Sequence, residues 1–82
     1  MKRTRGTIIS EVLDICANGA NKTRIVHQAS LNFKIVNPYL EILAKNGMIK
    51  TKEKGNRVEY KTTNKGLAFL DNIKEIEAEL PW

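Results

Sequence analysis

Cationic, amide and hydroxyl side chains gather in three short segments of this chain. Such side chains bind phosphate groups and the edges of nucleic-acid bases. The segments begin near residues 22, 33 and 50, at two expected helix starts and in a β-prone stretch. The candidate binding residues are Lys22, Thr23, Arg24, Phe33, Lys34, Asn37, Lys50, Lys52, Lys54, Asn56 and Arg57. If the fold brings them onto one surface, their combined chemistry is recognition of a polyanion.

The first segment follows Asn21, an expected helix cap, which puts Lys22, Thr23 and Arg24 in the first turn. Cations at this position oppose the helix dipole at a small cost, and a bound phosphate would reverse that cost. Phosphate contact and plain solvated charge are both consistent with these residues.

The second segment contains a local contradiction, because Pro38 interrupts a helical pattern. Either one helix begins after Asn32 and continues, bent, through Pro38, or a tight turn precedes a helix capped by Asn37. We predict the continuous, bent helix. Lys34 could reach a guanine edge or a phosphate, and Asn37 could pair with an adenine edge or act as a cap. Phe33 could contact a thymine methyl group or be partly buried in the core.

The third segment is predicted to be a β-hairpin with its turn at Gly55 and Asn56, flanked by runs over 48–52 and 57–62. Because side chains alternate along a strand, Lys50, Lys52 and Lys54 should share one face. Their mutual repulsion favours contact with an anionic surface, although lysines also protect an exposed strand from aggregation.

Apolar residues at helical spacing predict the elements that position these segments: a helix over 7–18 capped by Thr7, two more helices within 22–46, and a last helix from 64 to about 80. The first helix is apolar over much of its surface, so it should be the central strut of the core. A tight corner at 30–32 should join the second and third helices, with Leu31 filling the corner and Asn32 capping the third helix. In the third helix we assign a set of apolar residues chiefly to packing: Tyr39, Leu40, Ile42 and Leu43.

The last helix, capped by Thr63, is expected to return Leu67 and Leu70 to the core. A second apolar row on this helix has coiled-coil spacing. Its members, Phe69, Ile73, Ile76 and Leu80, are the predicted homodimer interface. The alternative is one amphipathic helix lying on its own domain.

Charge and length limit the classes of function. Eighty-two residues make one domain, of a size at which dimerisation is a reasonable expectation. The net charge is +5, and it is unevenly distributed: residues 1–63 carry twelve Lys and Arg against five Asp and Glu, whereas residues 64–82 carry two against four. Such an asymmetry favours a polyanionic partner.

Catalysis has no support in the sequence, and we expect no enzyme, cofactor or metal. The single cysteine, Cys16, excludes an intrachain disulfide and a cysteine-cluster zinc site, and His27 alone adds no partner. Cys16 could be a buried small side chain or form an intersubunit disulfide. The chain lacks a long apolar run and a secretory leader, so we expect a cytoplasmic protein.

Together these segments resemble an archaeal winged helix-turn-helix family that includes the Sso10a-type DNA-binding proteins and small archaeal transcriptional regulators. The resemblance is carried by KTRIVHQASLNFKIVNPYLEILAKNGMI, then the hairpin, then Tyr60-x-Thr62-Thr63-x-Lys65-Gly66-x-x-x-Leu70. It implies an α+β fold of three helices, a hairpin wing and a dimerising C-terminal helix. The corresponding parts are a flexible basic arm (1–6), the winged helix-turn-helix (7–63) and the last helix (64–82). Pro38 and the short last helix depart from the pattern.

The predicted function is therefore homodimeric double-stranded DNA binding in transcriptional regulation. The resemblance implies that the third helix enters the major groove and that the wing lies on the backbone or minor groove. The alternative is a winged-helix adaptor that binds proteins and not DNA. The DNA hypothesis requires Lys34, Lys52 and Arg57 to share one surface.

Overall fold

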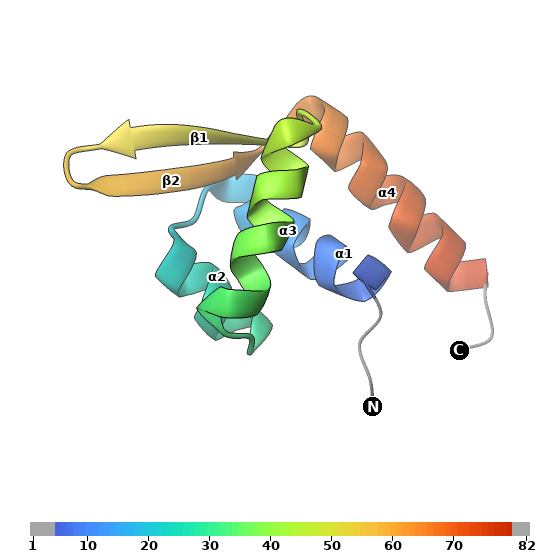
Figure 1. Cartoon of the computed structure of the whole chain (residues 1–82). Helices are drawn as coiled ribbons and strands as arrows, with labels where there is room; N and C mark the ends of the chain where they lie inside the picture. The colour runs from blue at the N-terminus through green and yellow to red at the C-terminus, as the bar shows by residue number, and fades with distance from the viewer. Residues whose placement is uncertain (1–4, 80–82) are drawn as a thin grey trace.

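The computed structural model describes residues 5–79, with side chains to residue 76. The order is α1 (Arg5–Ile15), a 3₁₀ turn (Cys16–Asn18), α2 (Lys22–Ala29), α3 (Phe33–Lys45), β1 (Ile49–Lys54), β2 (Arg57–Thr62) and α4 (Asn64–Glu79). The hairpin and α4 extend in different directions from a body formed by the first three helices (Figure 1). The predicted α+β order is confirmed. Within the described range, every helix is too short or too polar to cross a bilayer.

Helix α1 begins earlier than the sequence suggested. It starts at Arg5, so Thr7 lies inside the helix and is not its cap. The expected basic arm therefore loses Arg5 and Gly6 to α1, and its remaining residues, 1–4, lie outside the described residues. The helix buries Val12 and Leu13 completely, as expected of the central strut.

The corner between α2 and α3 forms as predicted. The Asn21 side chain accepts a hydrogen bond from the Arg24 backbone N–H at 2.8 Å, and Asn32 accepts one from Ile35 at 2.9 Å. These bonds satisfy N–H groups that a helix start leaves free. Between the helices Ser30 adopts a left-handed conformation with φ of +54°, and Leu31 packs against the core.

Helix α3 is continuous through Pro38, and the alternative of a helix capped by Asn37 is wrong. Asn32 caps the helix instead, and the buried row of Val36, Leu40 and Leu43 holds both sides of the proline against the core. That burial outweighs the one backbone hydrogen bond that proline cannot donate. The bend expected at Pro38 stays a prediction.

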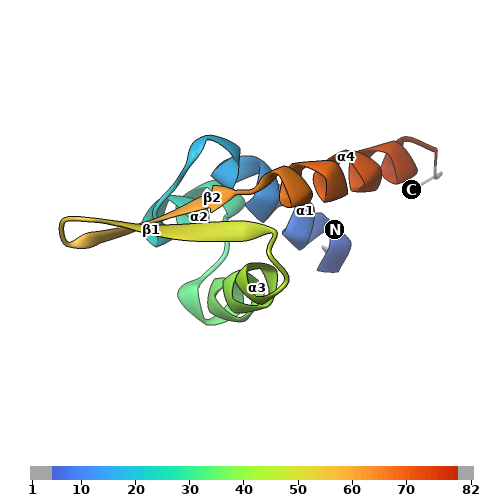
Figure 2. The same ribbon diagram turned by 90° about the horizontal axis from the view of Figure 1, so that it is seen from above.

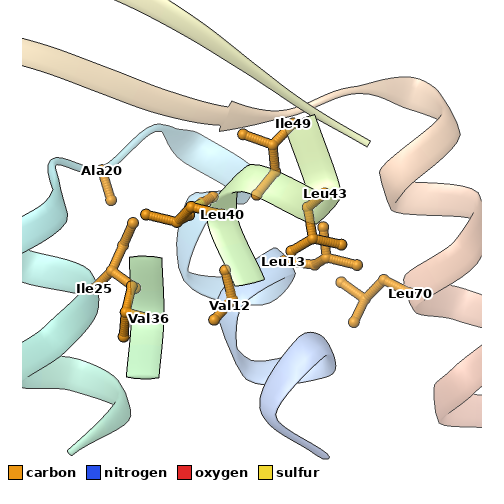
Figure 3. Packing of buried hydrophobic residues seen from close by; sticks show 10 residues of the cluster. Val12, Leu13, Ala20, Ile25, Val36, Leu40, Leu43, Ile49 and Leu70 are labelled. Atoms are coloured by element: carbon orange, nitrogen blue, oxygen red, sulfur yellow. The ribbon is translucent and has the colours of Figure 1, made fainter. Parts of the chain in front are cut away.

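The core lies where α1, α2, α3, the base of the hairpin and α4 meet (Figure 3). Its buried members are Val12, Leu13, Cys16, Ala20, Ile25, Val36, Leu40, Leu43, Ile49 and Leu70. Two assignments to packing were wrong: Ile42 is 56% exposed and Leu67 is 37% exposed. Ile42 lies on the flank of α3 away from the buried row, and the rotation of α4 turns Gly66 and Leu70 inward instead of Leu67.

The hairpin pairs β1 with β2 in an antiparallel register from Ile49 opposite Thr62 to Lys54 opposite Arg57. Strand β1 therefore runs further than predicted and leaves only Gly55 and Asn56 in the turn. Gly55 has a φ of +61°, the sign that the first position of a tight type II′ turn requires.

Beyond the hairpin, Ala20 adds an isolated bridge to β2. Its backbone exchanges both hydrogen bonds with Tyr60, at 2.9 and 2.8 Å. This bridge fixes the segment before α2 against the hairpin.

The start of α4 is tied to the end of α3. Thr63 caps α4 as predicted, because its Oγ1 accepts the Gly66 N–H at 3.1 Å. The same hydroxyl donates to the Gly47 carbonyl at 2.6 Å, and the Thr63 N–H donates to Met48 O at 2.9 Å. Gly66 itself lies directly beneath the Met48 carbonyl, where a Cβ would collide with that oxygen and stand 2.6 Å from Thr62 Cγ2.

Replacing Gly66 should test this contact. Helix propensity alone would make Gly66→Ala stabilising, but the collision with backbone should instead destabilise the fold by about 1–3 kcal/mol. Urea denaturation measures the difference. Asn72→Ala, at an exposed position of the same helix, is the control and should be neutral or slightly stabilising. A stable Gly66→Ala variant would show that α4 can shift away from Met48.

Cys16 is fully buried, and burial raises the pKa of its thiol from 9.0 to about 12. The unfolded chain therefore loses this proton at lower pH than the fold does. The stabilising contribution is complete below pH 9.0 and is lost as the pH rises towards about 12. We expect the free energy of unfolding to fall more steeply above pH 9 in the wild type than in Cys16→Ala. Equal slopes in urea titrations would contradict this expectation.

Candidate nucleic-acid interface

A hollow lies between the start of α2 and strand β2, and we call it the α2–β2 notch. One part is lined by Asn21, Lys22, Thr23, Arg57, Val58 and Tyr60. The adjoining part is lined by Gly19, Ala20, Asn21, Arg24, Lys54, Arg57, Val58 and Glu59. Arg57 lines both parts, so the notch brings a hairpin cation to the helix start.

The notch concentrates positive charge. Lys22 is half-buried, whereas Thr23, Arg24 and Arg57 are exposed. The first turn of α2 adds the partial positive charge of a helix N-terminus. A helix start flanked by Lys and Arg side chains is a site that accommodates a phosphate group. The structure therefore brings together the candidates from two separate segments of the sequence.

A groove, which we call the inner groove, continues from the notch between α3 and the hairpin. It is lined by Lys22, Asn37, Leu40, Glu41, Ala44, Thr51 and Tyr60. The side-chain oxygen of Asn37 is buried, and within the described part of the chain no donor reaches it. In this conformation the oxygen is not presented to an adenine edge, so that role requires the side chain to rotate.

The opposite face of the hairpin, which we call the lysine face, carries most of its charge. The register places Lys50, Lys52, Lys54, Arg57, Glu59 and Lys61 on this face. Thr51 points to the other face, as predicted, and lies with Tyr60 over α3. Seen from above, the hairpin extends from the helical body, with β1 on the side of α3 and β2 on the side of α2 (Figure 2).

The expected convergence of Lys34, Lys52 and Arg57 is only partly found. Lys52 and Arg57 share the lysine face, but Lys34 belongs to α3, which packs against the opposite face of the hairpin. The physical reason is that Ile49 and Thr62 must be buried, which commits their face of the hairpin to the core. Lys34 does not share that face, so the condition set from the sequence is not met in full. The cations that the fold does bring together are Arg57 and those at the start of α2.

The remaining candidates are accessible. Lys34 is exposed at the start of α3, and Phe33 is 47% exposed and outside the core cluster. Asn56 is exposed in the hairpin turn. The start of α3 and the turn of the hairpin are therefore both open to a partner.

Sequence reasoning missed several lining residues, among them Tyr60, Glu41 and Glu59. A two-residue turn at Gly55 and Asn56 fixes the strand register and places Tyr60 opposite Thr51. Tyr60 could therefore have been identified from the sequence. The bridge between Ala20 and Tyr60 gave no local signal, because it joins residues distant in the sequence.

The predicted dimer seam on α4 is partly exposed. Phe69 is 36% exposed and Ile76 57% exposed, whereas Ile73 is half-buried. Leu80 lies outside the described residues. Among the described residues, part of this apolar row is therefore exposed. The helix that carries the row extends from the body of the molecule (Figure 1).

Comparison with known proteins agrees with this geometry. The sequence profile described as winged helix-turn-helix matches residues 2–80. The chain belongs to the winged helix-turn-helix family. In the terms of that family, α2 and α3 form the helix-turn-helix and the β1–β2 hairpin is the wing.

Individual relatives support the family and the predicted resemblance to Sso10a-type proteins. An uncharacterized protein of Methanocaldococcus jannaschii, MJ0287, is 30% identical over 76 residues, which are 92% of this chain and 74% of that protein. The crystal structure of Sso10a-2, a DNA-binding protein from Sulfolobus solfataricus, superposes with a TM-score of 0.88 at 28% identity, covering 93% of this chain and 80% of that one.

A more distant structure shares the fold alone. The homodimeric winged helix-turn-helix DNA-binding domain Mb0332 from Mycobacterium bovis, a possible ArsR-family transcriptional regulator, has a TM-score of 0.69 at 19% identity. The match covers 88% of this chain and 68% of that chain.

Proposed function

We propose that this protein binds double-stranded DNA as a homodimer and regulates transcription. The observation that carries the proposal is the α2–β2 notch, where Lys22 and Arg24 meet Arg57 of the wing at a helix start. These groups come from distant parts of the sequence, and phosphate is the ligand that best fits their chemistry. The description of Sso10a-2 as a DNA-binding protein supports the same conclusion.

Two kinds of contact follow from this arrangement. The notch would hold backbone phosphates, and the wing would lie on the backbone or in the minor groove. The phosphate contacts would set the register of the protein on the duplex. The start of α3 would then face the major groove, where Lys34 and Phe33 are exposed. Lys34 would read a guanine edge or hold a further phosphate, and Phe33 would contact a thymine methyl group.

Removing the charges of the notch tests the proposal. We expect Arg24→Ala combined with Arg57→Ala to weaken binding to a mixed-sequence duplex, because two phosphate contacts are lost. The slope of log affinity against log salt should become shallower by about 2 in fluorescence anisotropy titrations.

The control is Lys45→Ala combined with Lys74→Ala, which removes the same charge at two exposed helical positions outside the notch. Equal losses in the two double variants would assign binding to net charge and not to the notch. A wild-type dissociation constant no tighter than about millimolar at low salt would overturn DNA binding and favour a protein–protein adaptor.

The dimer is proposed to form through α4. The exposed Phe69 and Ile76 lie on one side of this helix, and pairing with a second copy would remove them from water.

Sedimentation of Ile76→Glu tests that interface. A charge at the centre of the seam should turn dimers into monomers at micromolar concentration. Ala68→Glu adds the same charge at an exposed position outside the apolar row and should leave the mass unchanged. An Ile76→Glu variant that sediments like the wild type would exclude this seam as the dimer contact.

A further inference from the structure

One carboxylate lies among the cations of the notch. Glu59 is on the lysine face, opposite Lys52 in the hairpin register, and lines the same hollow as Arg24, Lys54 and Arg57. Its side chain is 32% exposed. A negative charge at this place weakens the attraction of the surface for a polyanion.

The Glu59 carboxylate is held in place from two sides. Its Oε2 lies 3.5 Å from the Lys54 Nζ, a diagonal cross-strand pair. On its other side the carboxylate lies against Gly19, where a Cβ would stand 2.9 Å from the carboxylate carbon. Gly19 thus leaves the space that Glu59 occupies.

We infer that Glu59 limits the affinity of the notch for phosphate by holding Lys54 in an internal ion pair. This inference rests on the proposed DNA binding and names a residue that tunes it. Among the described residues no ion-pair partner lies against Arg24 or Arg57, so a phosphate entering the hollow would meet these two as free cations, but Lys54 as one already neutralised by its neighbour. The carboxylate would also repel the phosphate directly. Glu59 acts through Lys54 and is therefore a positioning residue.

Such a residue keeps contact with the DNA backbone weak. Backbone contact carries no sequence information, so reducing it lowers the affinity for every duplex equally. Contacts made by α3 to base edges would then contribute a larger share of the binding free energy. Because the specific and non-specific affinities fall by the same factor, their ratio is unchanged, and the expected consequence is lower occupancy of non-specific duplex at a given protein concentration.

Glu59→Gln tests the inference, because it removes the charge and keeps the shape. We expect binding to a mixed-sequence duplex to become about 3- to 10-fold tighter at low salt. The slope of log affinity against log salt should become steeper by about 0.9, because Lys54 gains a phosphate contact.

Glu53→Gln is the matched control. It removes the same charge from the same hairpin, but Glu53 is exposed on the face opposite to Glu59. Its effect measures the general gain from a more positive protein and should stay below about twofold. A Glu59→Gln gain no larger than that of Glu53→Gln would overturn the inference.

A double-mutant cycle isolates the pair. Lys54→Gln should weaken binding little in the wild type and at least threefold more in the Glu59→Gln background, because only there is Lys54 free. Equal effects in both backgrounds would contradict the inference. Failure of the wild type to bind duplex at low salt would refute the proposed function itself, whereas normal wild-type binding with additive variants would refute only the role of Glu59.

Discussion

The alternation of side chains along two paired strands is the constraint on which the rest of the structure depends. Ile49 and Thr62 are buried at the base of the hairpin, and the Thr62 hydroxyl donates to the Leu13 carbonyl at 2.7 Å. One face of the hairpin is thereby committed to the core, and the residues that alternate with it must face solvent. The cations of the wing consequently gather on the outer face, and Arg57 near its tip reaches the start of α2.

The charged surface is predominantly, but not uniformly, positive. Two carboxylates lie on or beside it: Glu41 in the inner groove, and Glu59 paired with Lys54. An ion pair this exposed contributes little to stability, so stability is a weak explanation for its presence. Its electrostatic effect on a bound anion is the stronger explanation, because both groups lie where a phosphate backbone would approach.

Helix α4 is connected to the end of α3 through a short network of hydrogen bonds, donated by one backbone N–H and two side chains to main-chain carbonyls. Thr63 bonds to Gly47 and Met48, and Lys65 donates to the Asn46 carbonyl at 2.9 Å. The absence of a side chain at Gly66 allows the two backbones to approach. Helix α4, which would join two copies, therefore begins beside the end of α3. In such a dimer the packing of α4 would set the relative placement of the two α3 helices.

The sequence by itself determined the elements and their order, because apolar spacing, caps such as Asn21 and Asn32, and the turn at Gly55 are local signals. The sequence could not determine which cationic side chains lie close together in the fold. The continuity of α3 through Pro38 required tertiary burial on both sides of the proline, since local chemistry also allowed a helix start there. The notch likewise depends on the bridge between Ala20 and β2, a long-range pairing whose partners carry no mutual signal in the chain. Tertiary packing decided the site because the rotation of each element about its axis is fixed only by what it buries.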